Sequence, residues 1–375
     1  MASTIALEAV TKFYGETYAV GPVDLEIREG EFFSLLGPSG CGKTTTLRLI
    51  GGFEEASAGT IRIGDRVVDR IPVEKRGVGM VFQSYALFPH LSVFENIAFG
   101  LRLRRIAKPE LERRVGDTLK LVDLDGLAAR MPRQLSGGQQ QRAALARALV
   151  VEPSVLLLDE PLSNLDLKLR EQMREEIRRL QRRLGITAVY VTHDQGEAMA
   201  VSDRTAVMNA GRIEQVGTPR DIYEHPGTLF VASFIGQCNF LTGSVIGQAG
   251  EHLEFVSEHG TRLEIARREI GATDATVVIR PEAVALSFQG DVGDVARGSA
   301  PNRLVARVEE LVYLGEKIGV TLSLDLEGGG SGERLLASEQ IFRGQALPAV
   351  GDRLTVEIPP QECILIGSQG PHGST

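Results

Sequence analysis

The most constraining feature of this sequence is a glycine-rich segment between an apolar run and a helical one. Residues 37–45 read GPSGCGKTT, which matches the phosphate-loop pattern G-x-x-x-x-G-K-[ST]. The preceding EFFSLL is typical of a strand, and the following TTLRLI is typical of a helix. Such a loop curls its backbone N–H groups around phosphate, at a helix N-terminus that favours anions. The segment predicts an α/β domain that holds a nucleoside phosphate.

The chemistry of the loop residues suggests their roles. Gly40 and Gly42 allow the tight curl, Lys43 supplies a positive charge to the β and γ phosphates, and Thr44 offers a hydroxyl to Mg²⁺. A glycine turn beside a surface lysine is the alternative interpretation. The predicted nucleotide-binding residues of the loop are Gly37, Pro38, Ser39, Gly40, Cys41, Gly42, Lys43, Thr44 and Thr45.

Cys41 lies inside this loop, beside Lys43 and at the expected helix N-terminus. Both neighbours favour the thiolate form of a cysteine. We therefore expect a maleimide reagent to inactivate the protein by modifying Cys41, and MgATP to protect it. An inert small residue that only fills space is the alternative.

Two acidic residues end a second apolar run. SVLLLDE, residues 154–160, suits a parallel strand that is buried on both faces. Ligands of α/β folds bind at the carboxyl ends of such strands. We predict that Asp159 reaches Mg²⁺ and that Glu160 is the general base or orients the attacking water. Two acids that merely cap a turn are the alternative.

Two further strand ends carry polar side chains. ITAVYVTH ends at His193, and GVGMVFQ ends at Gln83. We predict that His193 donates a hydrogen bond to the γ phosphate. Gln83 is expected to offer its amide to Mg²⁺ or to the attacking water. A histidine or glutamine at a strand end is usually structural, so both predictions depend on the other motifs.

The surrounding pattern predicts the order of the elements. The first 30 residues alternate with period two, which indicates antiparallel strands, and TIRIGDRVV indicates a hairpin that turns at Gly64 and Asp65. Residues 88–152 are mostly helical in pattern. Between the strands at SVLLLDE and ITAVYVTH, apolar residues recur every three or four positions, which predicts a crossover helix and a parallel sheet.

The sequence changes character near residue 236. Beyond it, short alternating segments with glycine-rich breaks predict an all-β domain, built as one barrel or as two small ones. LEGGGSGERL is expected to form a hairpin tip, and GSQGPHGST a frayed end. We therefore predict a nucleotide-binding domain at residues 1–236, with a helical subdomain at about 88–152, and a β-barrel domain at residues 237–375.

Composition limits the environment and the partners. The net charge of −8 over 375 residues argues against a sequence-independent grip on nucleic acid. Cys41, Cys238 and Cys363 lack a CxxC pair, so we expect neither a disulfide framework nor a zinc site, and a reducing cytoplasm fits. No apolar run approaches the roughly 18 residues that span a bilayer, and the N-terminus lacks the form of a signal peptide. The chain by itself is expected to be soluble.

A second glycine turn needs an explanation. LSGGQQQR, residues 135–142, precedes a helical run and also suits phosphate binding. The chain already has a phosphate loop. The residues by themselves leave open what this second turn binds.

The motifs GPSGCGKTT, VFQ, LSGGQQQR, VLLLDEP, SNLD and VTHD, in this order, resemble those of the ATP-binding subunits of ABC transporters. The resemblance covers residues 4–236. It implies a P-loop ATPase with ATP and Mg²⁺ as cofactors, in a head-to-tail homodimer where each serine–glycine turn binds ATP held by the other copy. It also implies that Tyr14 stacks on adenine, for which a core tyrosine is the alternative. The further ATP-binding residues that it implies are Tyr14, Ser136, Gly137, Gly138, Gln139 and Asp166, the last communicating across the interface.

The β-rich half and the join GTPRDIYEHPGTLFVASFIGQCNF resemble bacterial importers with a C-terminal TOBE domain, an oligonucleotide-binding-like barrel. VIRPEAV and YLGEKIGVTL resemble sequence motifs that are usual in that domain. The resemblance implies that the barrel is a dimer scaffold, with binding of a regulator or of the solute as alternatives. Cys238 and IGGFE depart from the usual residues, away from the chemistry.

The segment VFQSYALFPHLSVFENIAFGLR is more similar to polyamine, ferric-iron and related importers than to sugar importers. The resemblance favours spermidine/putrescine import, with ferric iron, aminophosphonate, other organic solutes and sugars as alternatives. Residues 84–99 are expected to border the groove that receives a permease helix. The implied partners are two transmembrane permease subunits and, indirectly, an extracytoplasmic solute-binding protein, at the cytoplasmic face of the bacterial inner membrane.

Two other classes of function compete with transport. ABC-type ATPases also act on DNA or ribosomes. The DNA-repair forms insert a long coiled coil between the phosphate loop and the strand that ends in the two acids, and the ribosomal forms carry two cassettes in one chain. This chain has one cassette. A catalytically inactive binding module is disfavoured because Lys43, Asp159, Glu160 and His193 are all present. We therefore expect that ATP binding closes the dimer and that hydrolysis reopens it.

Overall fold

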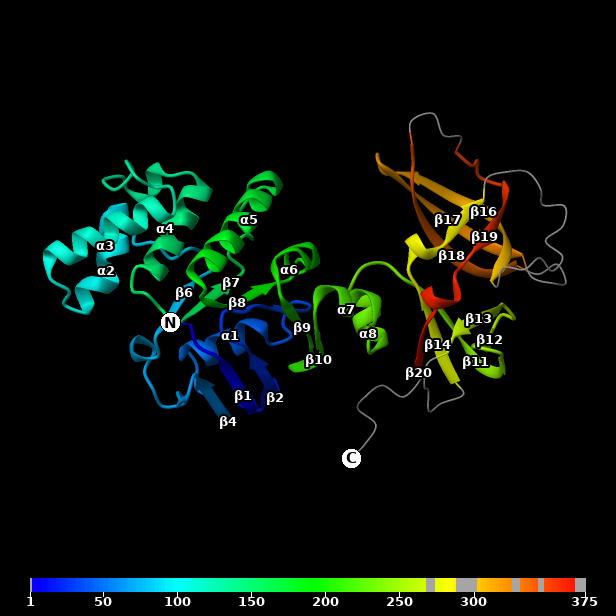
Figure 1. The fold of residues 1–375 in the computed structure, drawn as a ribbon, viewed down its shortest axis with the longest axis horizontal. Helices are drawn as coiled ribbons and strands as arrows, with labels where there is room; N and C mark the ends of the chain where they lie inside the picture. Colours follow the sequence, from blue (N-terminus) through cyan, green and yellow to red (C-terminus); the bar gives the residue numbers. More distant parts are fainter. Residues whose placement is uncertain (1, 268–273, 288–301, 326–330, 343–346, 368–375) are drawn as a thin grey trace. The chain divides into compact units, whose positions relative to one another are not determined.

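The computed structural model describes residues 2–267, 274–287, 302–325, 331–342 and 347–367 (Figure 1). Contacts between residues divide the chain into two compact units, residues 1–222 and residues 223–375. Within the described parts of the chain, no helix is both long enough and apolar enough to cross a membrane.

The first unit is built around a six-stranded sheet with strand order β10-β9-β3-β8-β7-β6. Strands β9, β3, β8, β7 and β6 pair in parallel, and β10 pairs with β9 in antiparallel fashion. β7 and β8 are buried along their whole length, as expected for strands covered on both faces. The bounds are β3 Phe32–Leu36, β6 Val78–Val81, β7 Val155–Asp159, β8 Thr187–Thr192, β9 Arg204–Asn209 and β10 Arg212–Gly217.

A second sheet is antiparallel, with the order β2-β1-β4-β5. It contributes to the same apolar cluster as helix α1, Lys43–Gly51, and the central sheet. The hairpin predicted at Gly64 and Asp65 is confirmed, because β4 and β5 pair on either side of these residues. The bounds are β1 Ile5–Tyr14, β2 Thr17–Ile27, β4 Ala58–Ile63 and β5 Arg66–Val67.

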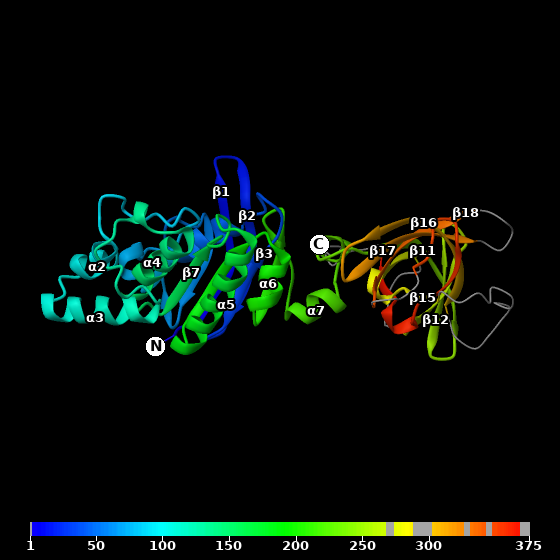
Figure 2. The same ribbon diagram turned by 90° about the horizontal axis from the view of Figure 1, so that it is seen from above.

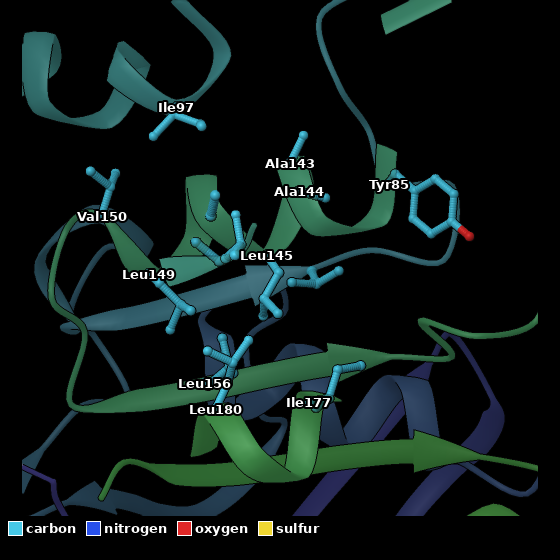
Figure 3. Packing of buried hydrophobic residues seen from close by; sticks show 14 of the residues in the cluster. Tyr85, Ile97, Ala143, Ala144, Leu145, Leu149, Val150, Leu156, Ile177 and Leu180 are labelled. Carbon is cyan, nitrogen blue, oxygen red and sulfur yellow. The ribbon is translucent and has the colours of Figure 1, made fainter. Parts of the chain in front are cut away.

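Helices cover the other face of the central sheet. The predicted helical stretch contains α2, Val93–Leu103, α3, Lys108–Leu121, and α4, Gly137–Leu149. The predicted crossover helix is α5, Leu167–Leu184, and α6, Gln195–Val201, contacts it. Figure 3 shows side chains of α2, α4, α5 and β7 gathered in one buried cluster. These helices therefore hold the strand ends that carry the predicted site.

The second unit consists of two antiparallel five-stranded sheets that share one apolar core. The predicted fold class, a P-loop α/β domain followed by an all-β domain, is therefore confirmed. The first sheet has the order β13-β12-β11-β14-β20, with bounds Arg262–Ala266, His252–Ser257, Asn239–Ala249, Asp274–Ile279 and Ile364–Gly367. The second has the order β15-β19-β16-β17-β18, with bounds Ala285–Ser287, Arg353–Glu357, Arg303–Tyr313, Lys317–Asp325 and Ser331–Gln340.

Two predicted irregular segments have different outcomes. The hairpin tip predicted at LEGGGSGERL lies partly outside the described residues, but residues 331–335 belong to β18 instead of a turn. The reason is that Leu335 is fully buried in the core of the unit. The frayed end predicted at GSQGPHGST lies, beyond its first residue, outside the described residues.

Residues 223–236 belong by their contacts to the second unit, whereas the sequence analysis assigned them to the first domain. They contain α8, Leu229–Phe234, and the end of α7, Pro219–Glu224. Arg280, which follows β14, donates hydrogen bonds to the carbonyl oxygens of Tyr223, at 2.8 Å, and of Ile235. Ala232 packs in a cluster with residues of β14 and β20. This attachment is tertiary and leaves no periodic pattern in the sequence.

Candidate nucleotide-binding site

The predicted phosphate loop connects β3 to α1. Gly40 and Gly42 have positive φ angles of 79° and 100°, which glycine adopts without strain. A Cβ atom on Gly42 would lie 2.7 Å from the carbonyl oxygen of Ala19, and one on Gly37 would lie 2.3 Å from that of Met208. The loop therefore needs glycine at Gly40 for conformation, at Gly37 for space and at Gly42 for both.

Lys43 is buried at the start of α1, with 5% of its surface exposed. Its Nζ donates hydrogen bonds to the carbonyl oxygens of Gly37, at 2.8 Å, and Pro38, at 2.9 Å. These carbonyls stabilise the ammonium but carry no formal charge. The positive charge of Lys43 thus remains available to an anion, which is what phosphate binding requires.

Thr44 and Asp159 bring two oxygen ligands together from α1 and the end of β7. The Thr44 hydroxyl donates to Oδ1 of Asp159 over 3.0 Å. Burial raises the pKa of Asp159, against the opposing effects of the Thr44 hydrogen bond and the Arg48 charge. A bound cation would offset this cost of burying the carboxylate charge. A hydroxyl and a carboxylate are hard oxygen ligands, which Mg²⁺ prefers, so Thr44 and Asp159 are suited to hold this ion.

Glu160 is held between two other predicted residues. Its Oε2 accepts a hydrogen bond from the Gln83 amide at 3.1 Å, and its Oε1 lies 3.3 Å from Nδ1 of His193. Its backbone has a φ of 43°, a left-handed conformation that costs energy in residues other than glycine. Its N–H donates to the carbonyl of Val191 on β8. The ends of β6 and β8 thus bring the side chains of Gln83 and His193 to the carboxylate of Glu160, which follows β7.

Two residues that the sequence analysis did not identify line the same pocket as Gln83 and Asp159. Asn164 donates from its amide to the carbonyl oxygen of Gln83 at 2.8 Å, and so holds the backbone at that strand end. Arg48 lies one turn after Thr44 on α1, a spacing that places both on one helix face. A pocket of about 340 Å³ is lined by Arg48, Phe82, Gln83, Ser84, Asp159 and Asn164.

The expectation of a reactive Cys41 thiolate is wrong. Only 3% of the Cys41 surface is exposed. Burial raises the pKa of Cys41, and this effect exceeds the opposing effect of the Lys43 charge. The sequence shows the neighbouring lysine but not the burial, which comes from packing in the cluster between the two sheets. The alternative, a small residue that fills space, fits the structure.

The second glycine turn caps a helix. Ser136 Oγ accepts from the N–H of Gln139 at 3.4 Å, and Gln139 Oε1 accepts from the N–H of Ser136 at 3.0 Å, a reciprocal capping box at the start of α4. A Cβ atom on Gly138 would lie 3.0 Å from Leu169 Cδ1. Ser136 and Gly137 are exposed. The binding role of these residues stays a prediction.

Asp166 has a structural role in its own chain. Its Oδ1 accepts a hydrogen bond from the N–H of Leu169 at 3.0 Å and so caps α5. Leu169 is the residue that Gly138 faces. The SNLD segment and the LSGG turn are therefore adjacent within one chain. Communication of Asp166 across an interface remains a prediction.

Tyr14 ends β1 with 45% of its surface exposed. The Lys12 ammonium lies 4.8 Å from the centre of its ring. The alternative of a core tyrosine is excluded by this exposure. Stacking on adenine stays a prediction.

The fold and the site define a phosphate-loop ATPase cassette joined to a β domain. A family model described as ABC transporter matches residues 20–163, and a model of the TOBE domain matches residues 277–366. The chain belongs to the ABC transporter family, as an ATP-binding cassette protein with a TOBE domain. The family resemblance predicted from the six motifs is thereby confirmed.

Relatives extend over most of the chain. A spermidine/putrescine import ATP-binding protein of Rubrobacter xylanophilus is 49% identical over 97% of this chain and 94% of its own length. The protein of the same description from Thermobifida fusca is 53% identical over 83% of this chain and 81% of its own.

A solved structure matches more than half of the chain. It is the dimer of the ATP-binding cassette MJ0796 in a post-hydrolysis state bound to ADP and Pi. It is 36% identical to this chain with a TM-score of 0.52, and covers 58% of this chain and 99% of its own.

Proposed function

We propose that this chain hydrolyses ATP to drive the import of polyamines of the spermidine and putrescine type through a separate permease. The observation that carries the catalytic part is the arrangement of Gln83 and His193 around the Glu160 carboxylate, next to the Thr44–Asp159 pair. The names of its relatives support the polyamine part.

The residues of the chain would divide the chemistry between them. Lys43 and the N–H groups of the loop hold the β and γ phosphates. Thr44 and Asp159, with Gln83 as a third ligand, would hold Mg²⁺, which when bound neutralises charge on the phosphates. The carboxylate of Glu160 accepts a proton from water as the water oxygen bonds to the γ phosphorus and the bond to the β–γ bridging oxygen breaks. His193 donates to the γ phosphate.

The site is completed by a second copy of the chain. In the head-to-tail homodimer that we propose, Ser136, Gly137, Gly138 and Gln139 of one copy contact the nucleotide bound by the other. Ser136 and Gly137 are exposed, so the turn is accessible to a second copy. A solved structure of a similar cassette is described as dimeric, which supports a dimer here.

The remaining assignments follow from the same function. Two permease subunits at the cytoplasmic face of the inner membrane receive the motion of the dimer, and a solute-binding protein acts through them. Residues 84–99 border the permease groove, and the β domain is the dimer scaffold. The relatives named as importers favour this function over action on DNA or ribosomes.

The substrate is tested by reconstitution. The chain would be combined in liposomes with its permease and the matching solute-binding protein, and ATP hydrolysis would be measured with and without solute. Spermidine or putrescine should stimulate hydrolysis, and a Glu160→Gln control should not respond. Stimulation by ferric iron or a sugar, but not by polyamines, would overturn the polyamine assignment and keep the ATPase.

A further inference from the structure

A buried carboxylate is bound to β8, the strand that precedes His193. Glu197 on α6 is 4% exposed, and its Oε2 accepts hydrogen bonds from the Tyr190 hydroxyl at 2.6 Å and the Thr192 hydroxyl at 2.7 Å. Burial and the neighbouring Glu197 charge raise the pKa of Tyr190 well above its usual range, so this hydroxyl remains a donor. Glu197 is thereby fixed to the last residues of β8.

The residue after His193 joins the same network. Asp194 Oδ1 accepts from the N–H of Glu197 at 3.0 Å, and the N–H of Asp194 donates to Thr192 Oγ1 at 3.0 Å. His193 therefore lies between Thr192 and Asp194, which are hydrogen-bonded to each other and to Glu197. Any displacement of this group displaces the backbone that carries the imidazole.

Arg170 connects this group to the SNLD segment. Its Nη1 lies 3.6 Å from Asp194 Oδ2 and its Nε lies 3.7 Å from Glu197 Oε1. Its Nη2 donates to the carbonyl oxygen of Leu165, the residue before Asp166, at 3.3 Å. Arg170 is on α5, and α5 and α6 run next to each other on the sheet (Figure 2). The Arg170 guanidinium thus contacts Leu165 of the SNLD segment as well as Asp194 and Glu197, which follow His193.

We propose that Arg170 is a positioning residue that couples the SNLD segment to His193. The proposal rests on the homodimer of the proposed function, in which Asp166 faces the other copy. When the dimer closes, a shift of the segment at Leu165 moves the guanidinium, and Asp194 and Glu197 follow it. His193 then reaches the γ phosphate only when the partner is in place.

The geometry suits coupling better than support of the fold. Glu197 already has two hydroxyl donors from β8 without Arg170. Within the described parts of the chain, the Arg170 Nε atom is buried and has no hydrogen-bond partner, because Glu197 Oε1 lies just beyond hydrogen-bond range. The guanidinium is held by the Leu165 carbonyl oxygen and by ion pairs to Asp194 and Glu197, so a shift of the backbone at Leu165 would change these contacts.

The test compares substitutions at two arginines of one helix in the full-length chain. Arg170→Ala should lower kcat for ATP hydrolysis about tenfold or more and leave KM for ATP nearly unchanged. Arg170→Lys keeps the charge without the planar fork and should recover only part of kcat. Arg174→Ala, one turn along α5 in a separate pocket with Arg178 and Arg182, should leave both constants unchanged. A normal kcat for Arg170→Ala would overturn the proposal.

A double-mutant cycle identifies the residue through which Arg170 acts. In a His193→Ala background, adding Arg170→Ala should change the remaining slow turnover by less than about twofold, because coupled residues are not additive. An additive loss would mean that Arg170 acts elsewhere. In histidine-labelled protein, the NMR resonance that His193→Ala removes should shift in Arg170→Ala and not in Arg174→Ala. An unmoved resonance would overturn the coupling.

A dimerisation assay separates failure of this proposal from failure of the proposed function. Glu160→Gln should stop hydrolysis and accumulate the ATP-bound dimer, measured by light scattering, with or without Arg170→Ala. If Glu160→Gln does not dimerise with ATP, the shared site of the proposed function is wrong. If both proteins dimerise and Arg170→Ala alone hydrolyses ATP normally, only the coupling is wrong.

Discussion

At the scale of single residues, the phosphate loop shows how burial changes the chemistry of neighbours. Lys43 and Cys41 are both nearly inaccessible. The Lys43 ammonium is satisfied by two backbone carbonyls. Lys43 Nζ also lies 3.8 Å from Cys41 Sγ, and its charge and hydrogen bond lower the pKa of the thiol, but burial has the larger, opposite effect. The same loop thus keeps a cation and suppresses a thiolate.

The raised pKa of Cys41 predicts slow and pH-dependent labelling. In a Cys238→Ser, Cys363→Ser background, the folded protein at neutral pH should react with a maleimide far more slowly than the unfolded protein does. The rate should rise with pH, because a raised pKa shifts the thiolate population to higher pH. Intact-protein mass spectrometry over time measures this rate. Rapid, stoichiometric labelling of the folded protein at neutral pH would contradict the buried position.

At the scale of elements, helix α4 contacts two of the motif regions, the LSGG turn and the segment that follows Gln83. Its N-terminus carries the capping box of Ser136 and Gln139. Arg147, in its last turn, donates to the carbonyl oxygens of Tyr85 at 2.9 Å and Ala86 at 2.6 Å. These two residues follow Gln83 and have left-handed φ angles of 60° and 49°. One helix therefore links the LSGG turn to the segment after Gln83.

The exposed start of α4 predicts the effect of a bulky substitution. Ser136→Arg should leave ATP binding by the isolated chain nearly intact, because Ser136 is exposed and its hydrogen bonds lie within its own turn. Turnover should fall roughly 100-fold or more if the turn supplies donors to the nucleotide of the other copy. Binding is measured with a fluorescent nucleotide and turnover by phosphate release.

A matched control removes a helix cap elsewhere. Ser92 caps α2 in the same kind of capping box, with Glu95. Ser92→Arg should lower the free energy of unfolding by about 1 kcal/mol, as loss of the Ser136 cap should. It should leave turnover of the isolated chain unchanged. Normal turnover in Ser136→Arg, or an equal loss in both variants, would argue against the shared site.

At the scale of the whole molecule, the two units have separate cores. The segment after residue 222 is tied to the second core by Arg280, which is 4% exposed. Its guanidinium also lies 4.1 Å from the centre of the Tyr223 ring and 2.8 Å from Cys238 Sγ. The start of the second unit thus depends on one buried cation.

This dependence predicts that one substitution destabilises one unit only. Arg280→Met keeps the aliphatic volume but leaves buried carbonyls without donors, which should cost about 2 to 3 kcal/mol. Calorimetry should show a lower transition temperature for the unit that does not respond to ATP. The ATP-responsive transition should stay unchanged, since ligand binding stabilises only the unit that binds it. A shift of both transitions, or of the ATP-responsive one alone, would contradict this division.

The sequence by itself determined the local elements and most of the strand ends that carry the site. The loop at 37–45, the polar ends at Gln83, Asp159 and His193, and the change to short strands are all local patterns, and a parallel sheet brings such ends together for any sequence with this order. Only the tertiary structure decided the burial of Cys41, the attachment of residues 223–236 to the second unit, and the positions of Asn164 and Arg170. Burial and hydrogen bonding depend on groups distant in the chain, and no local pattern encodes those contacts.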